Sequence, residues 1–389
     1  MKKQSNLDSQ DVKRTVAALR DDLLALLGEM VAINSYSHNA EGVVRVAHLV
    51  RQALPPPLAL ESASDSNERM LWTCRNGPTG VSPLLLVGHL DTVFPPDTFD
   101  SGVDAEGAYL LGPGVADMKG GLVVMVGALW TLDRLNALLG IPLLLAFNGD
   151  EEIGSPRSGE ILMELARSSR LGLVFECGGP GGSVVTSRRG LQRYRMEIRG
   201  EAGHAGNQPG DKKSALVELA HQILTLEALN DPRAGLSVNV GRVLGGNATN
   251  VIPEKAEAEF EVRFSEQRQG DEVEERIQTL ANSPHNSSLM VRVTHSHSRP
   301  VMARTPATTS LYRAVARIAE EIEITLSEEN RGGASDANLL AASGLPTIDG
   351  LGPVGEMDHS ENERILKNSL FQRVELLVHL LWNLKAWSQ

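Results

Sequence analysis

Five short segments of the chain offer histidine, aspartate or glutamate side chains that could bind a metal ion. His89 and Asp91 stand two residues apart after an apolar run, and side chains at positions i and i+2 of an extended segment point the same way. The imidazole could therefore bind an ion while the carboxylate holds the second ring nitrogen. The alternative for a His-x-Asp pair is an ordinary surface turn.

Two further segments are acidic. Asp117 ends a glycine-rich loop just before an expected helix, where aspartate would also serve as an N-cap. Three consecutive carboxylates, Asp150, Glu151 and Glu152, follow another apolar run and repel one another. A cation would relieve that repulsion, with one carboxylate binding the ion and its neighbour taking a proton from bound water. The alternative is a solvated acidic turn.

The last two segments supply one carboxylate and one imidazole. Glu176 follows a third apolar run, where an edge salt bridge is the alternative, and we interpret Cys177 as a small core residue rather than a ligand. The five segments together could bind two ions that share a carboxylate, through His89, Asp117, Glu152, Glu176 and His359. Imidazole with carboxylate suits zinc and leaves manganese or cobalt open.

The elements that must position these residues indicate an α/β fold. Pro83–Val87, Ile141–Phe147 and Leu171–Phe175 are short runs, apolar throughout, typical of buried strands in a mostly parallel sheet. Helical stretches, 118–139 and 158–168, lie between them, and a longer one covers 9–31. Because open α/β sheets bind ligands at the carboxyl ends of their strands, we expect the polar segments to meet there.

The pattern changes at about Arg188. Tyr194, Met196 and Ile198 alternate with charged residues, as do Ala258, Phe260 and Val262 in a later segment, which predicts antiparallel strands with one exposed face. We therefore expect an inserted α+β domain at 188–299. The catalytic domain would be discontinuous, 1–187 and 300–389, with helices on both faces of its sheet.

With these segments in place, the sequence resembles the di-zinc metallopeptidase family of glutamate carboxypeptidase, acetylornithine deacetylase and succinyl-diaminopimelate desuccinylase. The matching stretches occur in family order: Gly88-His-Leu-Asp-Thr-Val93, Gly112-Pro-Gly-Val-Ala-Asp-Met-Lys-Gly-Gly121, Asn148-Gly-Asp-Glu-Glu-Ile-Gly-Ser155, Gly203-His-Ala-Gly206, Asn250-Val-Ile-Pro253, Gly332-Gly-Ala-Ser-Asp336 and Asp358-His-Ser-Glu361. The amino-acid sequences of the second and third stretches most resemble those of the glutamate carboxypeptidase branch.

The resemblance implies a two-zinc centre. It assigns His89 and Glu176 to one ion, Glu152 and His359 to the other, and Asp117 to both. It further implies that Asp91 holds His89, that Glu151 is the general base, and that the Asp117–Met118 peptide bond is cis.

The resemblance also gives the inserted domain a role as lid and dimerisation domain. His204 would reach across a homodimer and stabilise the oxyanion, although on its own it could be a turn residue. The substrate carboxylates would be bound by Asn250, Arg263, Arg299, Gly332 and Gly333. Without the family context, Arg263 is simply an exposed cation on a strand.

Composition limits the class of protein. The 389 residues carry 37 Lys and Arg against 49 Asp and Glu, a net charge of −12, which argues against a nucleic-acid partner. We expect no membrane span, no signal peptide, reduced cysteines and a cytoplasmic location. The expected function is amide hydrolysis that releases a C-terminal amino acid, for example glutamate, from a peptide. The alternatives are an N-acyl-amino-acid deacylase and a non-catalytic binding protein on the same fold.

Overall fold

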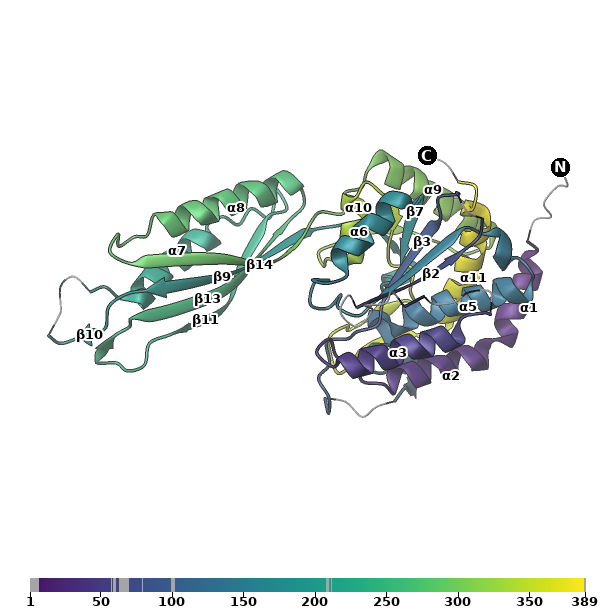
Figure 1. Ribbon diagram of the computed structural model, residues 1–389, viewed down its shortest axis with the longest axis horizontal. Coiled ribbons are helices and arrows are strands. Elements are labelled where there is room, and N and C mark those ends of the chain that lie inside the picture. Colours follow the sequence, from purple (N-terminus) through teal and green to yellow (C-terminus); the bar gives the residue numbers. More distant parts are fainter. Residues whose placement is uncertain are drawn as a thin grey trace. The chain divides into compact units, whose positions relative to one another are not determined.

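The computed structural model describes residues 7–56, 58, 61–62, 70–78, 80–98, 102–207, 210 and 212–387. The chain forms two compact units (Figure 1). Unit 1 comprises Met1–Ser187, Arg304–Arg331 and Ser335–Gln389, and unit 2 comprises Arg188–Ala303 with Gly332–Ala334. The chain thus enters unit 2 at Arg188, where the sequence pattern changes.

A six-stranded sheet forms the centre of unit 1, in the order β1-β2-β6-β3-β7-β16. Strands β3 (Leu84–His89), β6 (Leu143–Asn148), β7 (Leu171–Val174) and β16 (Thr347–Ile348) run parallel. At one edge β2 (Leu71–Asn76) pairs antiparallel with β6, and β1 (Glu61–Ser62) pairs antiparallel with β2. The three apolar runs are therefore the central strands, and the predicted α/β class with a mostly parallel sheet is confirmed.

Helices cover both faces of this sheet (Figure 1). The larger helical layer consists of α1 (Ser9–Ala18), α2 (Arg20–Val31), α3 (Ala40–Ala53), α5 (Gly120–Arg134) and α11 (Lys367–Leu384). The opposite face carries α6 (Gly159–Ser168) and α10 (Asp336–Ala342), and α9 (Pro306–Glu321) packs beside α11 and β16. Gly172 lets α10 approach the sheet closely, because a Cβ there would lie 2.9 Å from the side chain of Leu340.

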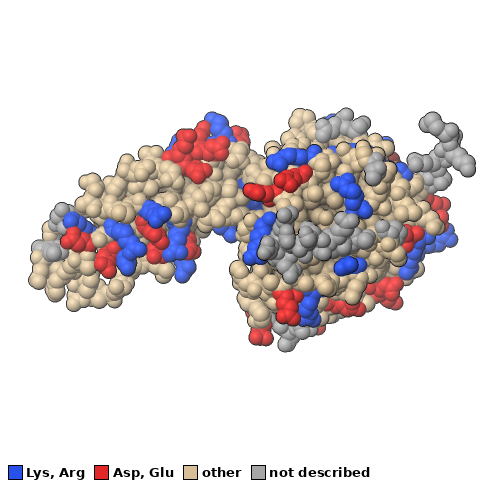
Figure 2. Space-filling view, viewed as in Figure 1, with Lys and Arg blue, Asp and Glu red and all other residues tan. Residues whose placement is uncertain are grey.

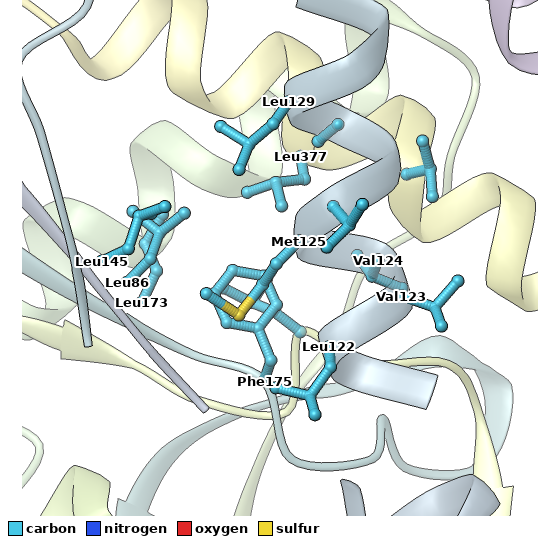
Figure 3. Close-up of a cluster of buried hydrophobic side chains, with 14 of the residues drawn as sticks. Leu86, Leu122, Val123, Val124, Met125, Leu129, Leu145, Leu173, Phe175 and Leu377 are labelled. Carbon is cyan, nitrogen blue, oxygen red and sulfur yellow. The ribbon is translucent and has the colours of Figure 1, made fainter. Parts of the chain in front are cut away.

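Helix α5 is apolar on nearly every side because it lies between the sheet and α11. Met125 and Leu122 pack toward Phe175 and the strand leucines, while Leu377 of α11 lies near Leu129 (Figure 3). By length and composition the helical stretch Val115–Arg134 could cross a membrane, but 89% of its apolar window is buried within the protein. This burial identifies it as a core helix.

The single helix expected over 9–31 is in fact two helices. The break falls at Leu19, whose φ of −96° and ψ of −4° depart from the regular helix, and whose N–H bonds to the Val16 carbonyl. Leu19 is itself fully buried. The apolar periodicity continues through the break because both helices bury their apolar side in the same core, so the sequence pattern did not reveal it.

Unit 2 is an antiparallel sheet in the order β11-β13-β9-β14, with α7 (Ala215–Glu227) and α8 (Gln267–Asn282) packed on it. Its strands are β9 (Gly190–Arg199), β11 (Ser237–Gly245), β13 (Lys255–Phe264) and β14 (Met290–Arg299). The buried face includes Tyr194 and Phe260, whose rings stack. The other face carries arginine and glutamate pairs such as Arg195–Glu257, and Figure 2 shows acidic and basic side chains interleaved over this unit.

Short elements complete the two units. A small sheet of unit 1 has the order β17-β18-β5-β4, and β8 pairs with β15. These elements are β4 (Asp104–Glu106), β5 (Tyr109–Leu111), β8 (Val184–Arg188), β15 (Glu328–Arg331), β17 (Gly355–Glu356), β18 (Arg364–Leu366), the π-helical turn η1 (Val115–Lys119) and the 3-10 turns η2 (Leu138–Gly140) and η3 (Pro180–Gly182). In unit 2, β10 (Gly203–His204) pairs with β12 (Val251–Ile252).

Candidate metal centre and active site

The carboxyl ends of three parallel strands bring the candidate ligands of unit 1 together. His89 is the last residue of β3, Glu152 lies in the turn after β6, and Glu176 follows the end of β7. Parallel strands end at the same edge of a sheet, so side chains far apart in sequence converge there. Asp117 in η1 and His359, in the turn after β17, complete the set.

The five side chains form two clusters that share Asp117. In the first, Nε2 of His89 lies 2.8 Å from Oδ1 of Asp117 and 3.7 Å from Oε1 of Glu176. In the second, Nε2 of His359 lies 3.0 Å from Oδ2 of Asp117 and 3.3 Å from Oε2 of Glu152. Within each cluster the potential ligand atoms lie within 4.8 Å of one another. Asp117 thus presents one carboxylate oxygen to each cluster.

Asp117 is not the N-cap that its position suggested. Helix α5 begins at Gly120, the residue in its N-cap position is Lys119, and no side chain caps it. The Asp117 carboxylate is instead directed to the two histidines, and the Asp117–Met118 peptide bond is cis, as the family resemblance implied.

Glu363 holds the backbone around Asp117, and the sequence analysis missed it. Its Oε1 accepts hydrogen bonds from the N–H groups of Ala116 (2.8 Å) and Asp117 (3.0 Å), and its Oε2 accepts one from Gly114 (3.1 Å). Burial, together with the charge of Asp117, raises the pKa of Glu363 to about 7. The only signal was its place four residues after His359, which does not reveal a contact spanning about 250 residues.

Asp91 connects His89 to the acidic turn. Nδ1 of His89 lies 2.9 Å from the backbone oxygen of Asp91 and 3.5 Å from its carboxylate. That carboxylate accepts hydrogen bonds from the hydroxyl of Ser37 (2.7 Å) and from the N–H groups of Glu151 and Glu152 (both 3.2 Å). Asp91 therefore orients the imidazole mainly through its backbone and fixes the acidic turn through its side chain.

The three consecutive carboxylates have different surroundings. Asp150 is buried and accepts hydrogen bonds from the hydroxyl of Ser158 and from two backbone N–H groups at the start of α6, so its role is structural. Glu152 belongs to the second cluster. Glu151 is half-buried next to Glu152 in the chain, and its charge contributes to raising the pKa of both Glu152 and Glu176.

The electrostatics of the clusters call for a cation. Burial and the charge of Asp117 raise the pKa of Glu152 to about 8 and that of Glu176 well above its ordinary range. Hydrogen bonds with Asp117 and Glu152 raise the pKa of His359 to about 11. Oε1 of Glu152 is buried and has no hydrogen-bond partner among the described residues. A divalent ion would stabilise these carboxylates, and the nitrogen and oxygen donor set fits zinc, manganese or cobalt.

The candidate residues of unit 2 fall into two groups. His204 is exposed on β10, and the N–H of the next residue, Ala205, bonds to the Asn250 carbonyl. Arg263 lies near the far end of β13, where its guanidinium donates to the carbonyl of Gly332 at 2.8 Å. The two groups lie toward opposite ends of β13. Lys255 begins this strand beside the first group, and at the usual rise per strand residue it is about 27 Å from Arg263.

The second group, that of Arg263 and Gly332, also includes the other predicted residues, Arg299 and Gly333. Arg188, which the sequence analysis did not select, donates from its guanidinium to the Gly333 carbonyl at 2.9 Å. Arg299, at the end of β14, is buried. Arg188 and Arg263 therefore contact the Gly332–Gly333 segment, and Arg299 lies at the same end of the sheet, because Arg263 and Arg299 both pair with Leu191. His204 and Asn250 form a separate group.

Comparison with known proteins identifies the family of this chain. The family model described as Peptidase family M20/M25/M40 matches residues 85–383. Carboxypeptidase G2 from Pseudomonas sp. (strain RS-16) is 29% identical over 313 residues, covering 79% of this chain and 75% of that protein. A succinyl-diaminopimelate desuccinylase from Methylorubrum extorquens (strain PA1) is 30% identical over 311 residues, covering 72% and 77%.

Solved structures share the fold. A tripeptidase from Staphylococcus aureus superposes with a TM-score of 0.77 at 20% identity, covering 95% of this chain and 99% of that one. A dinuclear metal binding peptidase of the M20 family from Bacillus subtilis gives a TM-score of 0.71 at 13% identity, with coverage of 95% and 99%.

Proposed function

Because the chain belongs to peptidase family M20/M25/M40, we propose that this peptidase- or deacylase-type hydrolase releases a C-terminal amino acid from a peptide or amide substrate, as a glutamate carboxypeptidase does. The observation that carries the proposal is the position of Asp117, which links a His89–Glu176 cluster to a His359–Glu152 cluster. Such a pair of clusters is suited to a two-metal hydrolytic centre.

Two divalent ions, with zinc as the first candidate, would be held by the two clusters, and Asp117 would bind both. Ions bound there would supply Lewis acidity, polarising the scissile carbonyl and making water nucleophilic at neutral pH. The orphaned Oε1 of Glu152 and the raised pKa values of Glu152 and Glu176 support this assignment.

Glu151 would move the protons of the reaction. Its carboxylate takes a proton from the attacking water and then delivers it to the nitrogen of the leaving amine. The Asp91 carboxylate fixes the backbone N–H of Glu151, which orients the turn that carries the base. Asp91 is itself buried and held by Ser37, so this support is rigid.

We further propose that two copies of the chain form a homodimer through unit 2. Helix α7 exposes Val217 (54%) and Leu224 (71%), and the edge strand β11 exposes Val243 (45%) and Leu244 (49%). An open strand edge with exposed apolar side chains is a favourable surface for pairing.

The separation of the two groups in unit 2 supports a role for both chains at one site. Arg263, Arg299 and the Gly332–Gly333 segment would bind the substrate carboxylate of their own chain, since arginine binds carboxylates in a bidentate manner. His204 and Asn250 lie about a strand length away from Arg263. We infer that they act in the active site of the partner chain. There the imidazole of His204 would donate a hydrogen bond to the developing oxyanion.

The function is tested by measuring amino-acid release from a panel of N-acyl amino acids and short peptides, using zinc-loaded protein with and without a chelator. Chelator-sensitive release confined to glutamate conjugates is the expected result. Absence of release from every substrate, with two metal ions bound per chain, would contradict the proposal and favour a binding role.

A deacylase is the second candidate, because desuccinylases are among the relatives at 30% identity. The same panel separates the two activities. Release of varied amino acids, or of diamino acids, from their acetyl or succinyl derivatives would assign the chain to the deacylase branch.

A further inference from the structure

A cavity of about 340 Å³ in unit 1 shares no residue with the metal centre. It lies between the turn η3, the segment that follows α9, and the first turns of α11. Its lining includes Gly181, Gly182, Thr325, Ser369, Gln372 and Arg373. A volume of this size is at the lower end of small-molecule pockets, which are usually about 300–1,000 Å³.

The cavity contains a buried cation whose charge is not balanced. Arg373 is only 4% exposed, and one of its terminal nitrogens donates to the carbonyls of Gly182 (2.9 Å) and Ser183 (3.3 Å). Among the described residues, no carboxylate lies within 4 Å of its guanidinium. The nearby carboxylate of Glu329 is bound by Nε of Arg331 at 2.6 Å.

This arrangement is unfavourable without a ligand. Moving a guanidinium out of water costs free energy that neutral carbonyls repay only in part, so buried arginines are usually paired with an acid. Burial and the charge of the nearby Arg331 lower the pKa of Arg373 to about 10, which reports the same imbalance. An anion in the cavity would supply the missing charge.

The rest of the lining is also suited to an anion. Gly181 and Gly182 have positive φ angles of 71° and 84°, and a Cβ at Gly181 would meet no atom within 4 Å, so backbone borders the cavity there. Leu366 and Ser369 belong to the start of α11, where the helix carries partial positive charge. The one acid in the lining, Glu323, points to solvent with its side chain 89% exposed and pairs with Lys13.

We propose that this cavity binds a small metabolite through an oxyanion group, a carboxylate or a phosphate, that pairs with Arg373. The planar guanidinium offers parallel N–H donors that match both kinds of oxyanion. The site is separate from the hydrolytic one, so its existence does not depend on the proposed function.

The test uses two probe anions on the metal-loaded full-length protein at constant ionic strength. Sodium selenate represents a tetrahedral oxyanion and sodium acetate a carboxylate, and each is titrated while the melting temperature is recorded. Selenate is also located by its anomalous scattering in crystals. We expect at least one probe to stabilise the protein, with density beside Arg373 if selenate binds.

Variants locate the binding. Arg373→Met should weaken it at least about tenfold, as expected for loss of a charge-assisted hydrogen bond. The matched control is Arg317→Met, which removes an exposed arginine on α9 outside the cavity. Because Arg373→Met could unfold the chain, Thr325→Glu is the second variant. It places a competing carboxylate on the exposed rim and should also abolish binding, whereas Thr325→Ser should not.

The two possible sites give different results. Anions bound at the metal centre would bind equally to all of these variants, because none alters a candidate ligand. Binding that is lost in both Arg373→Met and Thr325→Glu and kept in the controls establishes the site. Absence of binding to the unmodified protein, or binding that survives in either variant, overturns the proposal. Selenate alone would indicate a phosphate-type ligand, and acetate alone a carboxylate.

Discussion

His89 and His204 show how differently the two units hold residues proposed to act in one reaction. His89 is 2% exposed, and both of its ring nitrogens face protein partners, Asp117 on one side and Asp91 on the other. His204 is exposed, and its Nδ1 accepts one hydrogen bond, from the N–H of Gly206 at 3.2 Å. Unit 1 therefore fixes its histidine by burial and by partners on both ring nitrogens, whereas unit 2 leaves its histidine exposed with a single hydrogen bond.

The largest expected effect on activity comes from changing Asp117, the carboxylate that the two clusters of unit 1 share. Asp117→Asn removes the charge shared by the two clusters, so both metal ions should be lost and activity should fall on the order of 10⁴-fold or more. Metal analysis and turnover measure this, with Asp133→Asn in α5 as the control. Two ions retained per chain would show that Asp117 does not bridge them.

Glu151→Gln separates proton transfer from metal binding within unit 1. The amide cannot accept the proton, so kcat should fall about 10²–10⁴-fold while metal content stays unchanged. The matched control is Glu160→Gln, on the exposed side of α6. An unchanged kcat would remove Glu151 from the role of base.

His204→Ala tests the exposed histidine of unit 2. Loss of an oxyanion donor should lower kcat about 10²–10³-fold with metal content and melting temperature unchanged, whereas His48→Ala, at an exposed position on α3, should have no effect.

Co-expression then asks in which chain's site His204 acts. A dimer of one Glu151→Gln chain and one His204→Ala chain has one complete site if His204 serves its partner. Random pairing should then restore about one quarter of the activity. No recovery in isolated mixed dimers would place His204 in the site of its own chain.

The smallest effect concerns the acid stability of unit 2. Burial, with the charges of Arg299 and Arg193, lowers the pKa of His297 to about 4 from its ordinary 6.5. The unfolded chain then binds more protons, so stability is full above pH 6.5 and falls as the pH drops toward 4.

After allowance for partial exposure, the loss should be about 1 kcal/mol, or roughly 2–4 °C in melting temperature. His297→Gln should reduce this acid sensitivity, measured by thermal melts between pH 4 and 7 in comparison with the unmodified chain. Identical pH profiles would contradict the assigned cause.

The sequence indicated the central strands and the convergence of candidate ligands because both follow from local pattern. Leu84–Val87 and Leu143–Phe147 are apolar throughout, and the polar residues His89 and Asn148 end the two strands. The antiparallel strand β2 was not predicted, since its segment, with Cys74 and Arg75, has neither clear alternation nor a continuous apolar run. Strand β14 alternates only partly, because a bulge interrupts its pairing between His295 and His297.

Within the site, the sequence indicated the candidate ligands but not the residues that hold them in place. Nothing local distinguishes Asp150, which bonds to Ser158 and the start of α6, from Glu151 and Glu152 beside it. Glu363 looks like one more acidic residue of a surface turn, and only tertiary structure shows it holding Gly114–Asp117. Contacts over such sequence distances leave no periodic pattern.

The reach of Glu363 back to the loop of Asp117 has a consequence for how the protein is made. Translation delivers His89, Asp117, Glu152 and Glu176 first, then the whole of unit 2, and only afterwards His359 and Glu363. A nascent chain on the ribosome therefore carries an acidic, incomplete metal site for as long as unit 2 takes to be synthesised. Metal insertion is expected to be a late step in biogenesis, and ribosome-stalled chains ending before His359 should retain less metal than released protein.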